Sequence, residues 1–188
     1  FIIQPITNLF WRDKVVEVIN SFEATDQVGK TCWSYAIASA IYLSSKRIVG
    51  RSVPGVLTIR DRLVDQFGAC GQFPEEVMKI VLPDYGLHYK QVEEDQLRQI
   101  AEGCRVCVAT FSLDGAGWYN FSEFFCKNPK GTITQSVLQK YVPEEKLTNK
   151  KLRGHAVLLI DIEGDSLVFM NSWGESFADK GKFRIQRG

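Results

Sequence analysis

Three residues of this chain have side chains that together could form a nucleophilic catalytic site: Cys32, His155 and Asn171. Cys32 lies in the stretch GKTCWSYAIASA, whose apolar spacing predicts a helix from Cys32 to about Ile48 that stops at Gly50. A helix N-terminus has a partial positive charge and free backbone N–H groups, and both favour a thiolate over a thiol. Because the thiolate is the nucleophilic form of cysteine, the start of this helix suits a nucleophile.

A thiolate needs a proton partner, and His155 opens the strand-like stretch HAVLLIDI. Asn171 lies near the end of the next strand-like stretch, SLVFMNSW, and the residues EGDS at 163–166 predict a hairpin turn between the two. The start of the first strand and the end of the second come together in an antiparallel hairpin. We therefore expect His155 and Asn171 to be neighbours, with the asparagine fixing the imidazole ring, as described for cysteine hydrolases.

Each of these residues also has a more ordinary interpretation. Cys32 could be a buried core thiol, half of a disulfide or a metal ligand, and a cysteine at a helix start is more often structural. A histidine at a strand end is more often a surface or core residue, and the NSWG stretch could be a turn with a packing tryptophan. The catalytic interpretation is favoured because all three occur in this order on these elements, together with Gln27.

The elements that must position these residues divide the chain into two halves. The front half is helical: a second helix is predicted by the spacing of Ile59, Leu63 and Phe67, a third begins with Pro74 in its first turn, and a fourth ends at Gly103. Thr31 is the expected N-cap of the helix that begins at Cys32. The back half is strand-like, in the stretches CRVCVATFSL, HAVLLIDI, SLVFMNSW and GKFRIQR. This order predicts an α+β fold with a cleft between the halves, approximately 12–103 mainly helical and 104–188 mainly β.

Composition restricts the classes of function. The 188 residues include 45% hydrophobic and 24% charged residues, which is typical of a globular domain. A net charge of +1 argues against nucleic acid as the main partner, and no apolar run reaches the roughly 18 residues of a membrane span. The chain starts at Phe1, from which we expect a processed chain or an excised domain. Nothing indicates the oligomeric state.

Cysteine count and spacing bear on metal binding and redox state. Five cysteines are too few for a disulfide-built scaffold of this length, and an odd number leaves one unpaired. Cys104 and Cys107 form a C-x-x-C motif, but no second such motif follows, and the only histidines are His88 and His155. Because the pair lies in a strand-like stretch, we expect buried structural thiols rather than zinc ligands, and no metal or cofactor.

Four stretches of the chain resemble the papain family of cysteine proteases. They are WRDKVVEVINSFEATDQVGKTCWSYA, GACGQFP, GHAVLLI and NSWGESFADKGKFRIQRG, which are spread along the sequence from Trp11 to Gly188. The resemblance implies a papain-like α+β fold in a single catalytic domain over 1–188. It also implies a peptidase that binds extended polypeptides.

The resemblance assigns roles to individual catalytic residues. Cys32 would be the nucleophile, and His155 would take the thiol proton and later give one to the leaving amine. Asn171 would orient the imidazole, and Trp173 would shield the His–Asn hydrogen bond from water. Gln27 would donate, with the backbone N–H of Cys32, to the oxyanion that forms when a carbonyl is attacked.

The resemblance also assigns substrate-binding residues. Gly71 would let a substrate backbone approach closely because it has no side chain. Phe73 and Pro74 resemble the wall of the apolar pocket that takes the side chain two residues before the scissile bond. Trp33 is expected to pack between the two halves.

Several departures from the family pattern are visible. The residues before Cys32 are GKT instead of Cys-Gly-Ser, and the interval from Gln27 to Cys32 is one residue shorter than usual. No cysteine precedes Cys32 that could pair with Cys70, so the usual disulfides are missing. This predicts an intracellular, reducing compartment, most simply the cytoplasm, with a secreted or lysosomal location as the alternative. The basic segment 134–153 is longer than the family's connection and is expected either to border the cleft or to be a solvated loop.

Three functions are compatible with these observations. The first is a thiol-dependent hydrolase that cleaves peptide bonds through a Cys-His-Asn triad and an acyl-enzyme intermediate. The second is an isopeptidase or deubiquitinating-type hydrolase that acts on the tail of a folded, ubiquitin-like protein. The third is an inactive papain-like binding module, which the retention of Cys32, His155 and Asn171 argues against.

Overall fold

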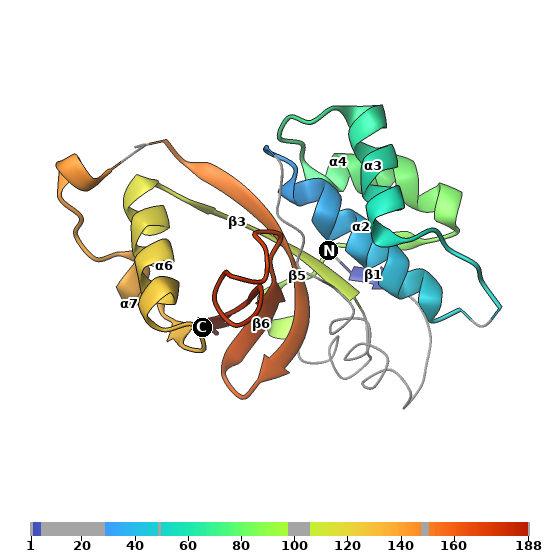
Figure 1. The fold of residues 1–188 in the computed structure, drawn as a ribbon. Coiled ribbons are helices and arrows are strands. Elements are labelled where there is room, and N and C mark those ends of the chain that lie inside the picture. The colour runs from blue at the N-terminus through green and yellow to red at the C-terminus, as the bar shows by residue number, and fades with distance from the viewer. Residues whose placement is uncertain (1, 5–28, 49, 98–105, 148–150, 188) are drawn as a thin grey trace.

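The structure is a computed structural model that describes residues 2–4, 29–48, 50–97, 106–147 and 151–187. Helices lie on both sides of a mostly antiparallel sheet, so the fold is α+β, as the sequence predicts (Figure 1). The described α-helices are α2 (Cys32–Lys46), α3 (Val56–Phe67), α4 (Pro74–Val81), α6 (Gly115–Lys127) and α7 (Gln135–Leu138). Short 3₁₀ turns cover Leu82–Tyr85, Glu94–Gln96 and Glu144–Lys146.

The described part of the chain forms a seven-stranded sheet with the order β2-β1-β3-β5-β6-β7-β4. Its strands are β1 (Ile2–Gln4), β2 (His88–Lys90), β3 (Val106–Leu113), β4 (Thr132–Ile133), β5 (Arg153–Glu163), β6 (Ser166–Met170) and β7 (Lys182–Gln186). All the strand pairs are antiparallel except β4 with β7. The central strands β3, β5 and β6 therefore come from the back half of the chain, while β1 and β2 extend the sheet from the front half.

Helix α2 is buried on nearly every side. Its residues Ile37, Ala38, Ala40 and Ile41 have no exposed surface, and even Ser44 is buried. A helix that is apolar all round must be covered on all sides. Figure 1 shows α2 lying between the sheet on one side and α3 and α4 on the other. The position of α2, and hence of Cys32 at its start, is thus fixed by packing along most of the helix.

The alternation of side chains along β5 separates two hydrophobic cores. Ala156 and Leu158 belong to the core shared with α2, while Val157 and Leu159 belong to the core on the opposite face. Successive residues of a strand point to opposite faces of the sheet, which explains this division. The second core is filled by aromatic rings from α6, and Figure 1 shows that helix on the far side of the sheet from α2.

Most of the predicted elements are confirmed, but α6, α7 and the short strands β1, β2 and β4 were not predicted. The helix from Cys32 ends at Lys46, close to the predicted end, and the turn EGDS joins β5 to β6, with Gly164 at φ 59°. The predicted helix end at Gly103 lies outside the described residues. Helix α6 was not predicted, because the back half was interpreted as strands. No described helix has both the length and the apolar character that a bilayer crossing requires.

Candidate active site

A cleft of about 910 Å³ lies between the helical half and the β half of the chain. On the helical side it is lined by the start of α2 and by the segment that leads into α4. On the β side it is lined by parts of β3, α6 and β5 and by Trp173. Its lining residues are Gly29, Lys30, Cys32, Trp33, Gly71–Glu76, Thr110, Phe111, Ser112, Trp118, Ser122, Arg153–Ala156 and Trp173. Cys32 and His155 therefore face the same cleft from different halves.

Cys32 is the first residue of α2, as the sequence predicts, but Thr31 does not cap the helix as expected. Thr31 occupies the N-cap position with a ψ of 17°, and its side chain makes no capping hydrogen bond. A capping residue normally has an extended backbone, which directs its hydroxyl to the first-turn N–H groups. The Thr31 carbonyl instead accepts from the backbone N–H of Ser34 at 3.0 Å and from the Ser34 hydroxyl at 2.8 Å.

Two opposing influences act on the pKa of Cys32. Burial raises the pKa of the thiol, while hydrogen bonds from the backbone at Ala156, Trp33 and Cys32 itself lower it. The last two are at the start of α2, where N–H groups point out of the helix. Ala156 follows His155 directly in β5, and its side chain is on the α2 face of the sheet. The contact with Ala156 thus places the sulfur against the strand that holds the histidine.

His155 and Asn171 are joined by a hydrogen bond of 2.8 Å between His155 Nε2 and Asn171 Oδ1. The backbone N–H of Ser172 donates to the same oxygen at 2.8 Å. A backbone N–H can only donate, so the atom that it contacts must be the amide oxygen rather than the amide nitrogen. His155 Nε2 must then carry a hydrogen, which leaves Nδ1 of the neutral ring with a free lone pair.

Aromatic rings surround the His155 imidazole. Trp173 lies over it at 4.7 Å with an interplanar angle of 31°, while Phe111 and Trp118 meet it edge-on at 5.6 and 5.8 Å. His155 is only 5% exposed, and burial lowers the pKa of its imidazole to about 4, although the hydrogen bond to Asn171 opposes this. The ring is therefore held rigidly and in its neutral form near neutral pH.

Sequence reasoning missed Trp118 because it missed α6. Trp118, Phe121 and Phe125 have the spacing of one helix face, and Asp114 stands where an N-cap is expected. Asp114 Oδ1 accepts from the backbone N–H of Gly117 at 2.8 Å, which confirms that cap. This signal could have predicted the helix, and with it a tryptophan beside the strand that contains His155.

The three residues suggested for substrate binding line the helical wall. Gly71 and Phe73 are exposed, Phe73 by 81%, and Pro74 is buried in the first turn of α4. Trp33 is buried, and its indole N–H donates to the carbonyl of Cys70 at 2.9 Å. Trp33 therefore anchors the chain beside Gly71, and it belongs to the hydrophobic core that α2 shares with Ala156 and Leu158 of β5.

Gln27, the cysteines and the basic segment 134–153 were also singled out in the sequence. Gln27 and Cys104 lie outside the described residues. Cys32, Cys70, Cys107 and Cys126 are free thiols. The described residues of 134–153 mostly lie along α6, where the Asn120 amide donates to the carbonyls of Leu138 and Lys140, and Arg153 alone among them reaches the cleft. Within the described ranges, no three His, Cys, Asp or Glu side chains gather as a metal site requires.

Three solved structures with a similar fold are cysteine proteases by name. Xylellain, a cysteine protease from Xylella fastidiosa, is 18% identical with a TM-score of 0.56 over 88% of this chain and 76% of that chain. The bromelain protease from Ananas comosus, in complex with the E64 inhibitor, is 16% identical with a TM-score of 0.55 over 94% and 87%. The Carica candamarcensis cysteine protease CMS1MS2, in complex with E-64, is 17% identical with a TM-score of 0.51 over 95% and 87%.

These likenesses show that the fold is papain-like. Identities of 16–18% are too low to carry more than the fold. No protein-family model matches the chain, and no curated protein sequence matches it. Any activity must therefore be argued from the site itself.

Proposed function

We propose that this chain is a cysteine-type peptidase that cleaves peptide bonds through Cys32, His155 and Asn171. The observation that carries the proposal is the hydrogen bond of 2.8 Å between His155 Nε2 and Asn171 Oδ1. It leaves Nδ1 as the basic nitrogen of a ring that shares a cleft with the thiol of Cys32. A nucleophile, a base and a group that orients the base are the three parts that nucleophilic catalysis requires.

The first half of the reaction is acylation. His155 Nδ1 takes the proton from Cys32 Sγ while the sulfur adds to the substrate carbonyl carbon, so a C–S bond forms and the carbonyl oxygen becomes an oxyanion. The backbone N–H of Cys32, at the start of α2, is placed to donate to that oxygen. We propose Gln27 as the second donor. The oxyanion then collapses, the C–N bond breaks, and the protonated His155 gives its proton to the leaving amine.

The second half is hydrolysis of the acyl-enzyme. His155 takes a proton from a water molecule that attacks the thioester carbonyl, and the C–S bond breaks as that proton passes to the sulfur. The acid leaves and the thiol is restored. Asn171 does not react, because it only holds the ring through Oδ1, and Trp173 shields that hydrogen bond from one side of the ring.

The burial of both reacting side chains supports this order of events. Burial raises the pKa of Cys32 and lowers the pKa of His155 to about 4, so the resting pair is a neutral thiol beside a neutral imidazole. Proton transfer then accompanies attack instead of preceding it. The face of Trp173 lies over the ring and favours the positive imidazolium that forms during the reaction.

Replacement of the nucleophile tests the proposal. We expect Cys32→Ala to abolish hydrolysis of a peptide library and to leave the thermal unfolding midpoint nearly unchanged, because the side chain is small and lines an open cleft. A thiol-directed epoxide should label Cys32 in the wild-type chain, as located by peptide mass mapping. Cys126→Ala is the matched control, since Cys126 is an exposed thiol on α6 away from the cleft lining.

Two results would overturn the proposal: full hydrolysis by Cys32→Ala, or epoxide labelling at Cys126 in place of Cys32. Substrates with an isopeptide bond to a ubiquitin-like protein, assayed beside the peptides, separate an endopeptidase from an isopeptidase.

A further inference from the structure

Among the charged side chains that line the cleft, the acidic ones have ion-pair partners in the described residues and the basic ones do not. Four charged side chains face it at neutral pH: Lys30, Arg153, Glu75 and Glu76. Both glutamates lie in the first turn of α4 and pair with Lys79, at 3.6 and 3.1 Å. In the part of the chain that the structure describes, neither Lys30 nor Arg153 has a carboxylate partner. The catalytic end of the cleft thus has two cations whose charge no described carboxylate neutralises.

Arg153 lies close to the catalytic histidine for a reason of strand geometry. It is the first residue of β5, and it pairs with Leu113 of β3 while His155 pairs with Phe111. Residues two apart in a strand point to the same face, so Arg153 and His155 share the face that α6 covers. The indole N–H of Trp118 on α6 donates to the carbonyl of Arg153 at 3.2 Å, which fixes the backbone at this position.

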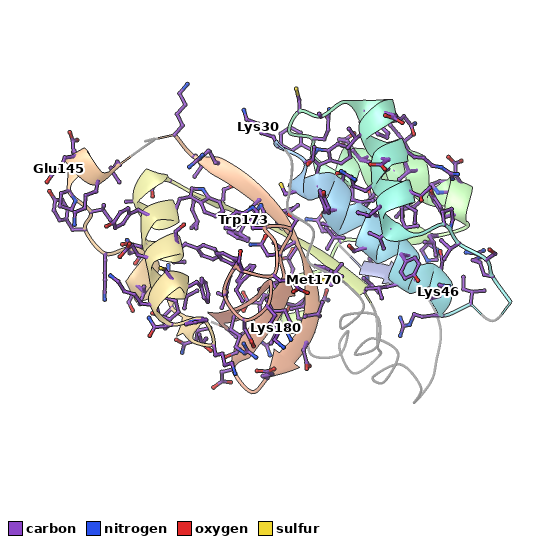
Figure 2. All side chains as sticks on the ribbon, in the orientation of Figure 1. Lys30, Lys46, Glu145, Met170, Trp173 and Lys180 are labelled. Atoms are coloured by element: carbon purple, nitrogen blue, oxygen red, sulfur yellow. The ribbon has the colours of Figure 1, made fainter. Side chains whose placement is uncertain are left out.

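Lys30 approaches the catalytic centre from the opposite wall. It stands two residues before Cys32, and Figure 2 shows it beside the N-terminal end of α2. Its ammonium group is exposed, as is the Arg153 guanidinium. Two positive groups on either side of the same cleft produce a local potential that attracts a carboxylate.

The chemistry of the reaction decides which part of a substrate Arg153 meets. His155 protonates the leaving amine, so the residue that follows the scissile bond must lie beside the imidazole. The acyl part extends instead toward the helical wall, where Cys32 and Gly71 lie. Arg153, on the same face as His155, is therefore the charged side chain next to the first residue of the leaving group.

We infer that the site selects peptides with a glutamate or aspartate side chain directly after the scissile bond. The Arg153 guanidinium pairs with this carboxylate, because it offers a planar fork of N–H donors to it. Lys30 adds a smaller attraction from the opposite wall. This inference rests on the proposed peptidase activity, and it names the substrate class of that site.

Three peptides that differ only in the residue after the scissile bond test the inference. With glutamate, glutamine or lysine at that position, we expect the wild-type chain to show kcat/KM about fivefold higher for glutamate than for glutamine, the upper end of what one solvent-exposed charge pair contributes. Lysine should be the poorest of the three. High salt should shrink the glutamate-to-glutamine ratio, because the two cations are exposed.

Variants assign the preference to named residues. Arg153→Gln should bring the glutamate-to-glutamine ratio to within about twofold of unity, and Arg153→Glu should reverse the order so that lysine is preferred. Arg153→Lys should keep part of the preference. Lys30→Gln should reduce it by a smaller factor. Lys46→Gln is the control, because Lys46 ends α2 about 20 Å from Cys32 at 1.5 Å per residue and should leave all three rates unchanged.

The possible results separate this inference from the proposed activity. If all three peptides are cleaved at similar rates, or if Arg153→Gln keeps the wild-type ratio, the acidic preference is refuted and the peptidase activity stands. If none of the three is cleaved and a random peptide library is also intact, the activity itself is refuted and the inference falls with it.

Discussion

Replacing His155 with glutamine should make the protein less sensitive to mild acid. Burial lowers the pKa of the folded-state imidazole to about 4, whereas the ordinary value is 6.5. Between these values the unfolded chain binds a proton that the folded chain does not. Stability from this residue is therefore fully present above about pH 6.5, falls as the pH drops toward 4, and changes little below it.

The size of the effect follows from that difference. A shift of about 2.5 pKa units corresponds to about 3.4 kcal/mol, of which about 2 kcal/mol is lost between pH 7 and pH 5. No discount for solvent screening is needed, because His155 is 5% exposed. Glutamine cannot take up this proton, and its amide N–H can still donate to Asn171 Oδ1. The free energy of unfolding of His155→Gln should thus fall by about 2 kcal/mol less than that of the wild type over this range.

Urea unfolding at pH 7, 6 and 5, followed by far-UV circular dichroism, measures both chains under the same conditions. Other groups titrate in both proteins, so the difference between the two slopes isolates position 155. His88→Gln provides a matched control, since His88 is exposed on β2 and outside the cleft. Parallel curves for the wild type and His155→Gln, within about 0.5 kcal/mol, would refute the conclusion that the imidazole is held neutral by burial.

Two further predictions concern the reaction and helix α6. The active pair holds one proton, shared by Cys32 and His155, so kcat/KM should fall below about pH 4, where the His155 imidazole becomes protonated on both nitrogens. At alkaline pH, kcat/KM should fall only above the ordinary pKa of a cysteine, because burial raises the pKa of Cys32. A loss of kcat/KM already near pH 6.5 would contradict the conclusion that burial lowers the pKa of His155. Asp114→Ala should lower the free energy of unfolding by about 1 kcal/mol, because it removes the acceptor for the Gly117 N–H, and Asp114→Asn should keep most of that stability. Urea unfolding of both variants checks this, and an alanine variant as stable as the wild type would show that the cap is not needed.

Local signals in the sequence were enough to place the candidate catalytic residues on their elements. The apolar spacing after Cys32 predicts α2 because a helix repeats every 3.6 residues, and the glycine in EGDS predicts the turn because it adopts a positive φ, 59° in the structure, without strain. The hairpin in turn determines that His155 and Asn171 meet, since antiparallel pairing brings the two strand ends together.

Tertiary structure decided what surrounds those residues. The sulfur of Cys32 meets the backbone of Ala156, a contact between segments far apart in the chain that no local pattern encodes. The ring of Trp118 reaches His155 only because α6 packs on the opposite face of the sheet from α2. The pKa of His155 depends on that burial. Likewise, the sequence shows a basic segment over 134–153, but strand pairing and α6 determine that Arg153, among the described residues of this segment, faces the cleft. The residue types and the periodicity of apolar residues can be read from the sequence. The burial of side chains and the contacts between distant segments are determined only when the two halves pack together.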